Sequence, residues 1–250
     1  MGNQYKTNKI IKFILRLDFV GEVEELKNNM PTQVAEKIKM AFPIFNQRNL
    51  TETSVMVTND QLSKTDKQIT EWSYSDAEGK NKIILSTKYI IFDSDRYESF
   101  ESVKSKFIEV IKEIMNLKNV QISRTGIRYI NLFEHKEFEI DDNNKWKEYF
   151  EDELFKTQIL GELKDYVSQT IDTIDIYKGN YMIKLKTGLS NKQYPINNRV
   201  YDFIIDCDGF SMSVITNVND LEESIEEIHT DIEHVFENCI KEKMRERLNG

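Results

Sequence analysis

The feature that most constrains the fold is the order in which apolar patterns follow one another in the first half of the chain. Residues 10–20 (IIKFILRLDFV) have the length and apolar content of a strand with at least one buried face. Three apolar residues spaced by four then predict a short helix between Pro31 and Pro43: Val34, Ile38 and Phe42. Four strands and a long amphipathic helix are expected to follow, at 54–58, 69–75, 82–86, 89–93 and 99–117.

The same order begins again in the second half. Residues 120–133 predict a strand, and residues 146–154 predict a short amphipathic helix. Two hairpins are expected next: 171–177 with 181–186 across Lys178-Gly179-Asn180, and 200–206 with 210–215 across Cys207-Asp208-Gly209. A long helix, capped by Asn219 or Asp220, is expected to continue to Met244.

This repeated order predicts an α+β protein built from two pseudo-duplicated β-α-β4-α halves, residues 1–118 and 119–250, within one compact unit. Its strands would form a long antiparallel sheet with the two long helices on one face, a layout like that of the TATA-binding protein. The other face would be open to a partner, a ligand or a second layer. In the competing interpretation, residues 134–164 are an inserted linker and the halves do not match.

Charge and cysteine usage limit the classes of partner. The chain has 34 basic and 43 acidic residues among 250, a net charge of −9. Such a balance argues against a chain-wide electrostatic grip on nucleic acid or an anionic membrane. We find no secretory signal pattern and no run of apolar residues long enough to span a membrane. Cys207 and Cys239 lie far apart without a CxxC motif, so we expect a reducing, cytoplasmic location and no membrane partner.

One segment is distinctive, Arg124-Thr125-Gly126-Ile127-Arg128-Tyr129-Ile130-Asn131, with Tyr97-Glu98-Ser99-Phe100, Trp72 and the Phe42-Pro43 pair upstream. Together these motifs resemble a sporadically distributed bacterial family of uncharacterised proteins of about this length, which have an R-x-G-[LI]-R-Y-I-N strand. The resemblance covers mainly residues 10–133, and Phe100 stands where Trp is common. It implies no known chemistry. The patchy distribution suggests an accessory gene of mobile or defence-associated loci.

The same strand offers a candidate binding site. Alternation along a strand places Arg124, Gly126 and Arg128 on one sheet face, with the two guanidinium groups about 13 Å apart. Arginine binds phosphate or carboxylate with two hydrogen bonds, so this face is a candidate anion cradle. In the alternative, each arginine pairs with an acidic side chain of a neighbouring strand.

Aromatic and amide side chains on the predicted sheet allow two interpretations. Trp72, Tyr129 and Asn131 could stack on and hydrogen-bond to the bases of a single-stranded nucleic acid. Sheet aromatics are more often part of the core.

No catalytic or metal-binding constellation is apparent. The sequence has no GxxxxGK[ST] or GxGxxG phosphate loop, and its three histidines do not stand at metal-ligand spacing. Asp206 and Asp208 lie where we predict a hairpin turn rather than a calcium loop. We therefore predict no catalytic residue, no metal ligand and no cofactor. Scattered carboxylates leave weak sequence traces, so a metal-dependent enzyme stays open as an alternative.

From these observations we expect a non-enzymatic binding or regulatory subunit of a bacterial accessory system that acts through protein–protein contacts. An exposed edge strand would also allow a homodimer. The alternative from a different class is recognition of a nucleic acid or nucleotide through the sheet face of Arg124 and Arg128.

Overall fold

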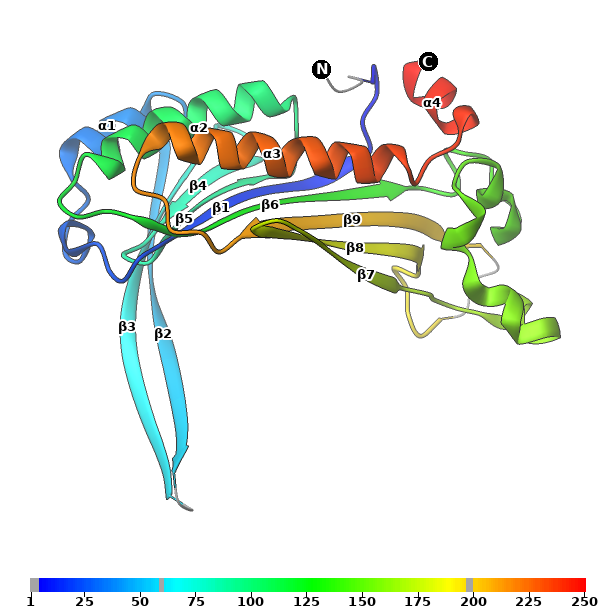
Figure 1. Cartoon of the computed structure of the whole chain (residues 1–250), viewed down its shortest axis with the longest axis horizontal. Helices are drawn as coiled ribbons and strands as arrows, with labels where there is room; N and C mark the ends of the chain where they lie inside the picture. Colours follow the sequence, from blue (N-terminus) through cyan, green and yellow to red (C-terminus); the bar gives the residue numbers. More distant parts are fainter. Residues whose placement is uncertain (1–4, 59–60, 197–199) are drawn as a thin grey trace. The chain divides into compact units, whose positions relative to one another are not determined.

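The computed structural model describes residues 5–58, 61–196 and 200–250 (Figure 1). The backbone divides into two compact units. Unit 1 contains Met1–Phe13, Gly126–Ser211 and Glu223–Gly250, and unit 2 contains Ile14–Thr125 and Met212–Glu222. Two strands and one helix contribute residues to both units.

The elements follow one another along the chain as strands, α-helices and short 3-10 helices (η). They are β1 (Ile10–Phe19), η1 (Glu24–Leu26), α1 (Thr32–Lys39), β2 (Ile44–Thr58), β3 (Gln61–Ser75), β4 (Asn81–Leu85), β5 (Tyr89–Ser94), α2 (Phe100–Met115), β6 (Ile122–Phe133), η2 (Asn143–Glu148), η3 (Asp152–Leu154), η4 (Lys156–Tyr166), β7 (Asp172–Lys178), β8 (Tyr181–Ser190), β9 (Asp202–Ser211), α3 (Val218–Glu237) and α4 (Glu242–Asn249).

The strands pair in the order β2-β3-β4-β5-β1-β6-β9-β8-β7, in a nine-stranded antiparallel sheet. This confirms the α+β class and the large antiparallel sheet. No helix of the described residues is long and apolar enough to cross a membrane.

Unit 2 has its core between α1, α2 and one face of the sheet (Figure 1). Along β1 the side chains alternate, and Leu15, Leu17 and Phe19 are buried. Helix α2 begins where the Ser99 side chain accepts a hydrogen bond from the Ser102 N–H at 3.2 Å, an N-cap that satisfies one of the free donors of the first turn. This start agrees with the predicted helix.

Unit 1 packs the part of α3 from Glu223 onward against β9. At Gly209 a Cβ atom would lie 2.6 Å from Cγ2 of Ile228 and 2.9 Å from Cδ1 of Ile232. The missing side chain therefore lets the helix approach the strand closely. A second cluster of this unit contains Trp146, whose indole N–H donates to the Tyr201 carbonyl at 2.9 Å.

The predicted hairpin across Cys207-Asp208-Gly209 was wrong. Strand β9 is continuous, and its residues at this point lie opposite Leu185, Lys184 and Ile183 of β8. Gly209 serves the close approach of α3 instead of a turn. Among the described residues, three strands (β7, β8, β9) follow β6, where four were expected.

Two helix predictions in the second half were also wrong, for a shared reason. The expected helix at 146–154 is replaced by η2 and η3, and the expected helix to Met244 is interrupted between α3 and α4. At both interruptions the backbone is extended, because Phe150 and Ile240 form an antiparallel bridge. The Glu151 N–H donates to the Cys239 carbonyl at 3.1 Å, and the Lys241 N–H donates to the Tyr149 carbonyl at 2.8 Å. Long-range pairing therefore overrides the local helical pattern.

The strands predicted at 54–58 and 69–75 exist but are far longer than expected. β2 and β3 form one hairpin in which Ile44 lies opposite Ser75 and Thr58 lies opposite Gln61. The long C-terminal helix is capped by Asn217 rather than by Asn219 or Asp220, since the Asn217 side chain accepts from the Asp220 N–H at 2.9 Å.

Candidate functional site

The hairpin of β2 and β3 extends well beyond the rest of its sheet neighbours. Only Trp72–Ser75 of β3 pair with β4, so residues 48–58 and 61–71, which we call the arm, form a two-stranded ribbon. At about 3.3 Å per residue the arm is roughly 36 Å long. Figure 1 shows it projecting away from the remainder of unit 2. Along the arm no described strand pairs with the outer edge of either β2 or β3.

The arm and its root, the paired residues 44–47 and 72–75, expose apolar side chains from β2. The exposed fractions are 50% for Ile44, 48% for Phe45, 36% for Leu50 and 57% for Val55. A two-stranded hairpin is only marginally stable in water without further packing. The strand edges and apolar side chains of this ribbon are therefore available to pack against another protein chain.

Ion pairs fasten the arm to the body of unit 2. Glu52 in β2 accepts from Lys88 Nζ at 2.5 Å, and Lys67 in β3 forms an ion pair with Glu22. Glu52 and Lys67 lie directly opposite each other in the hairpin. Both strands of the arm are thus tied to the rest of unit 2 at the same position along the hairpin, and residues 53–66 lie further towards the tip.

A buried carboxylate, that of Glu71, lies nearer the root of the arm than Glu52 and Lys67. Glu71 is 3% exposed, pairs with Arg48 across the hairpin and accepts a hydrogen bond from the Tyr89 hydroxyl. Burial of the phenol, followed by its hydrogen bond to Glu71, raises the pKa of Tyr89 to about 12. The Glu71 carboxylate raises the pKa of Arg48, and the Lys67 ammonium lowers the pKa of Glu22.

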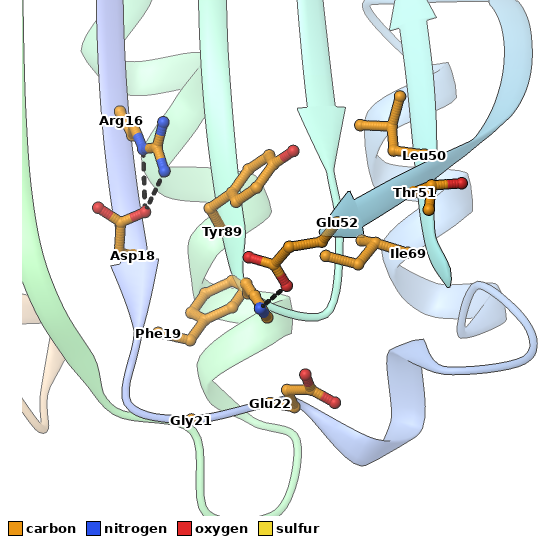
Figure 2. Close-up of a pocket in the computed structure, with 11 residues that line it drawn as sticks. Arg16, Asp18, Phe19, Gly21, Glu22, Leu50, Thr51, Glu52, Ile69 and Tyr89 are labelled. Atoms are coloured by element: carbon orange, nitrogen blue, oxygen red, sulfur yellow. Dashed lines mark hydrogen bonds and ion pairs between the residues drawn. The ribbon is translucent and has the colours of Figure 1, made fainter. Parts of the chain in front are cut away.

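A pocket of about 650 Å³ lies beside the arm, lined by residues of β1, the following loop, β2, β3 and β5 (Figure 2). Its charged groups neutralise one another. Arg16 donates from Nε and Nη2 to Asp18 at 2.9 and 2.7 Å, and its guanidinium carbon lies 4.7 Å from the centre of the Tyr89 ring. Lys88 is paired with Glu52. The pair of Lys88 with Glu52 joins the arm to the segment between β4 and β5. An anionic ligand in this pocket would have to displace carboxylates that already bind its basic side chains.

The predicted anion strand is β6. Arg124 lies in unit 2, and its Nη1 is 3.5 Å from Asp18 of β1. Arg128 lies in unit 1 and makes a two-point contact with Asp206 of β9, at 2.8 and 2.6 Å, which raises the pKa of Arg128. Gly126 between them is buried. Both arginines thus have acidic partners on neighbouring strands, the second of the two alternatives considered for this strand.

The aromatic and amide candidates are interior residues. Trp72, Tyr129 and Asn131 are buried, Trp72 in unit 2 and the other two in unit 1. The Tyr129 hydroxyl lies 3.0 Å from Nδ1 of His229, and its ring packs edge-on against Phe13 at 4.8 Å between centres. This burial favours the core interpretation over base stacking.

One polar cluster was missed by the sequence analysis. Asp202 of β9 accepts from the backbone N–H of His135 at 3.0 Å, lies 2.8 Å from its Nδ1, and is 3.2 Å from Lys192 Nζ. Burial alone would raise the pKa of Asp202, but these hydrogen bonds outweigh it and lower the pKa. The partners are too far apart in sequence for any local pattern to indicate them. Within the described ranges, no three or more His, Cys, Asp or Glu side chains are grouped to hold a metal ion.

Comparisons with known proteins add little to this geometry. No family model and no curated protein matches the chain. Among solved structures, it is similar to the RNA triphosphatase Pct1 of S. pombe in complex with the Spt5 CTD, at 9% identity, covering 97% of this chain and 83% of that chain, with a TM-score of 0.12. A likeness at that level supports no argument about fold or activity.

Proposed function

We propose that this protein is a non-enzymatic, cytoplasmic binding subunit that engages a protein partner through the arm. The observation that carries the proposal is the ribbon of β2 and β3. No strand of the described residues pairs with its outer edges along the arm, and its exposed side chains include Leu50 and Val55. Unpaired edges supply main-chain donors and acceptors to an added strand, and alternate side chains supply selectivity.

The charge of the hairpin favours a protein partner over nucleic acid. Basic and acidic side chains nearly balance between residues 44 and 75, namely Arg48, Lys64 and Lys67 against Glu52, Asp60, Asp66 and Glu71. A β-ribbon that enters a DNA groove needs a net positive charge to neutralise phosphates. Recognition of a nucleic acid or nucleotide by Arg124 and Arg128 would further require displacing their present carboxylate partners.

Membership of the bacterial family that the β6 motif resembles, and a role in an accessory or defence-associated system, are likewise proposals. We also propose that the two halves arose by internal duplication, since each has a first long strand, further strands and a long amphipathic helix.

A shortened arm tests the proposal. Glu52 and Lys67 are Cα partners, so replacing residues 53–66 by Asn-Gly closes the hairpin with a two-residue turn. The variant keeps the contacts of Glu52 with Lys88 and of Lys67 with Glu22. We expect nearly unchanged thermal stability and loss of the proteins that the full chain captures from its native host.

The matched control is Arg128→Ala, which alters the sheet in unit 1 and leaves the arm intact. It should capture the same proteins as the natural chain. Capture that survives the shortened arm and fails with Arg128→Ala would refute the arm as the binding surface and favour β6.

A further inference from the structure

We propose that the outer edge of β2 pairs with the β2 edge of a second copy of this chain, antiparallel, about a two-fold axis at Leu50. This inference rests on the proposed function, because it names one occupant for one edge of the arm. It leaves the outer edge of β3 from residue 61 to 71 for a different protein.

The β2 edge lacks the devices that keep edge strands from pairing. Proteins protect such edges with lysine, proline, bulges or short strands. β2 is 15 residues long and contains neither lysine nor proline. β3, in contrast, has Lys64 and Lys67 in the arm. The unprotected edge is therefore β2.

Charge complementarity selects one register. Arg48 and Glu52 are the only charged residues of β2, and each already has a partner in its own chain, Glu71 and Lys88, so a facing charge of the second copy would add to these pairs. In an antiparallel two-fold pair, each residue faces the residue at the same distance on the other side of the axis. Only an axis at Leu50 places Arg48 directly opposite Glu52 of the second copy, twice per dimer. Opposite charges in facing positions stabilise a strand pair, and like charges destabilise it.

The same register aligns the exposed apolar side chains. Leu50 would face Leu50 of the second copy, and Phe45 would face Val55, so that groups now exposed to water would cover one another. The paired segment would run over residues 44–56. It would end at Pro43, which has no backbone N–H to donate.

The interface is small, which sets the conditions of the test. Thirteen or so residues per copy are fewer than the ~20–30 of a standard interface, so we expect dissociation in the micromolar range or weaker. Measurements should therefore span about 1–200 µM protein.

Cysteine cross-linking tests the axis directly. Cys207 and Cys239 are buried, so Leu50→Cys adds an accessible thiol at the axis, where facing Cα atoms lie within disulfide range. The control is Val55→Cys, a more exposed position whose two copies would stand about 33 Å apart along the ribbon. With diamide as oxidant we expect a covalent dimer of Leu50→Cys only. Equal or faster cross-linking of Val55→Cys would overturn the proposed register.

Complementary charge variants give a second test that does not depend on cysteine chemistry. Arg48→Glu alone and Glu52→Arg alone each place like charges opposite one another at both positions, so each should be monomeric by sedimentation. Mixed together they restore both opposite-charge pairs, and a heterodimer should form. Within its own chain Arg48→Glu loses the ion pair with Glu71, and Glu52→Arg loses the one with Lys88, but these losses are the same before and after mixing. A mixture that stays monomeric while the natural chain dimerises would refute the register.

Failure here is distinguishable from failure of the proposed function. A natural chain that is monomeric up to the highest concentration refutes self-pairing. If, in that case, the shortened-arm variant still fails to capture the proteins that the natural chain captures, the arm remains the binding surface.

Discussion

Replacing Gly209 by alanine probes the packing that makes β9 a strand rather than a turn. The added Cβ would meet Cγ2 of Ile228 at 2.6 Å and Cδ1 of Ile232 at 2.9 Å, where ordinary contacts are about 3.5–4.0 Å. Ile232 can turn its terminal methyl aside. Cγ2 of Ile228 is attached at Cβ on a helix, where one χ1 rotamer dominates, so relief there requires the helix itself to move.

The magnitude follows from opposing effects. Overpacking a core by one methyl group costs about 1–3 kcal/mol. Loss of glycine's freedom in the unfolded chain returns about 0.4–1 kcal/mol. We therefore expect the free energy of unfolding to fall by about 1–2 kcal/mol and the melting temperature by roughly 2–8 °C. Urea denaturation followed by circular dichroism, together with calorimetry, measures both.

A double-mutant cycle isolates the cause. Ile228→Ala removes the nearest clashing atom and is destabilising by itself, by about 2–5 kcal/mol. In that background Gly209→Ala should cost little or nothing. If Gly209→Ala is as stable as the natural chain, or costs the same in both backgrounds, close approach of α3 does not explain this glycine.

Three further substitutions test the electrostatics of the two units. Arg128→Ala should lower the free energy of unfolding, measured by urea denaturation, by about 1–3 kcal/mol. The double variant with Asp206→Ala should recover part of that loss, because no carboxylate is then left without its partner. Unchanged stability with loss of nucleotide binding would instead support an anion site. The lowered pKa of Asp202 means that its stabilisation is present above its unfolded value of about 3.9 and disappears as pH falls through the folded value, so the stability gap to Asp202→Asn should close on acidification to about pH 2. Because the pKa of Tyr89 is raised to about 12, its stabilisation is complete below about pH 10 and is lost as pH rises towards 12. Tyr89→Phe should remove that alkaline loss. The chain has 11 tyrosines, so the phenolate absorbance of the natural chain minus that of Tyr89→Phe isolates this group, and a difference that titrates near pH 10 would contradict the prediction.

Local patterns identified the elements whose periodicity reflects burial on one face. Residues 10–20 predicted β1, and the apolar face from Ser99 predicted α2 with its cap. The turn at Lys178-Gly179-Asn180 was confirmed, with Gly179 in the left-handed region that favours glycine.

The arm could not be delimited in this way. Residues 44–53 of β2 are exposed, and a strand that buries neither face shows no apolar alternation. Gly209 was misinterpreted for a related reason, since the close helix that explains it is brought there by tertiary packing alone.

The candidate site was predictable only as a set of residue types. Alternation along β6 placed Arg124 and Arg128 correctly on one strand, yet their partners Asp18 and Asp206 come from distant parts of the sequence. Both explanations of these arginines fitted the sequence, because the strands that carry their acidic partners are brought beside β6 only by the fold.

Amide hydrogen exchange along β2 and β3 tests the central claim, that the arm is a binding surface, most directly. Exchange is compared at low and high protein concentration and after addition of a protein captured from the native host. We predict that the outward-pointing amides of residues 44–56, which are not hydrogen-bonded to β3, become protected at high concentration and that protection in the arm increases with the captured protein. Uniformly fast exchange in the arm under all three conditions, with new protection confined to β6 and β9, would contradict the account.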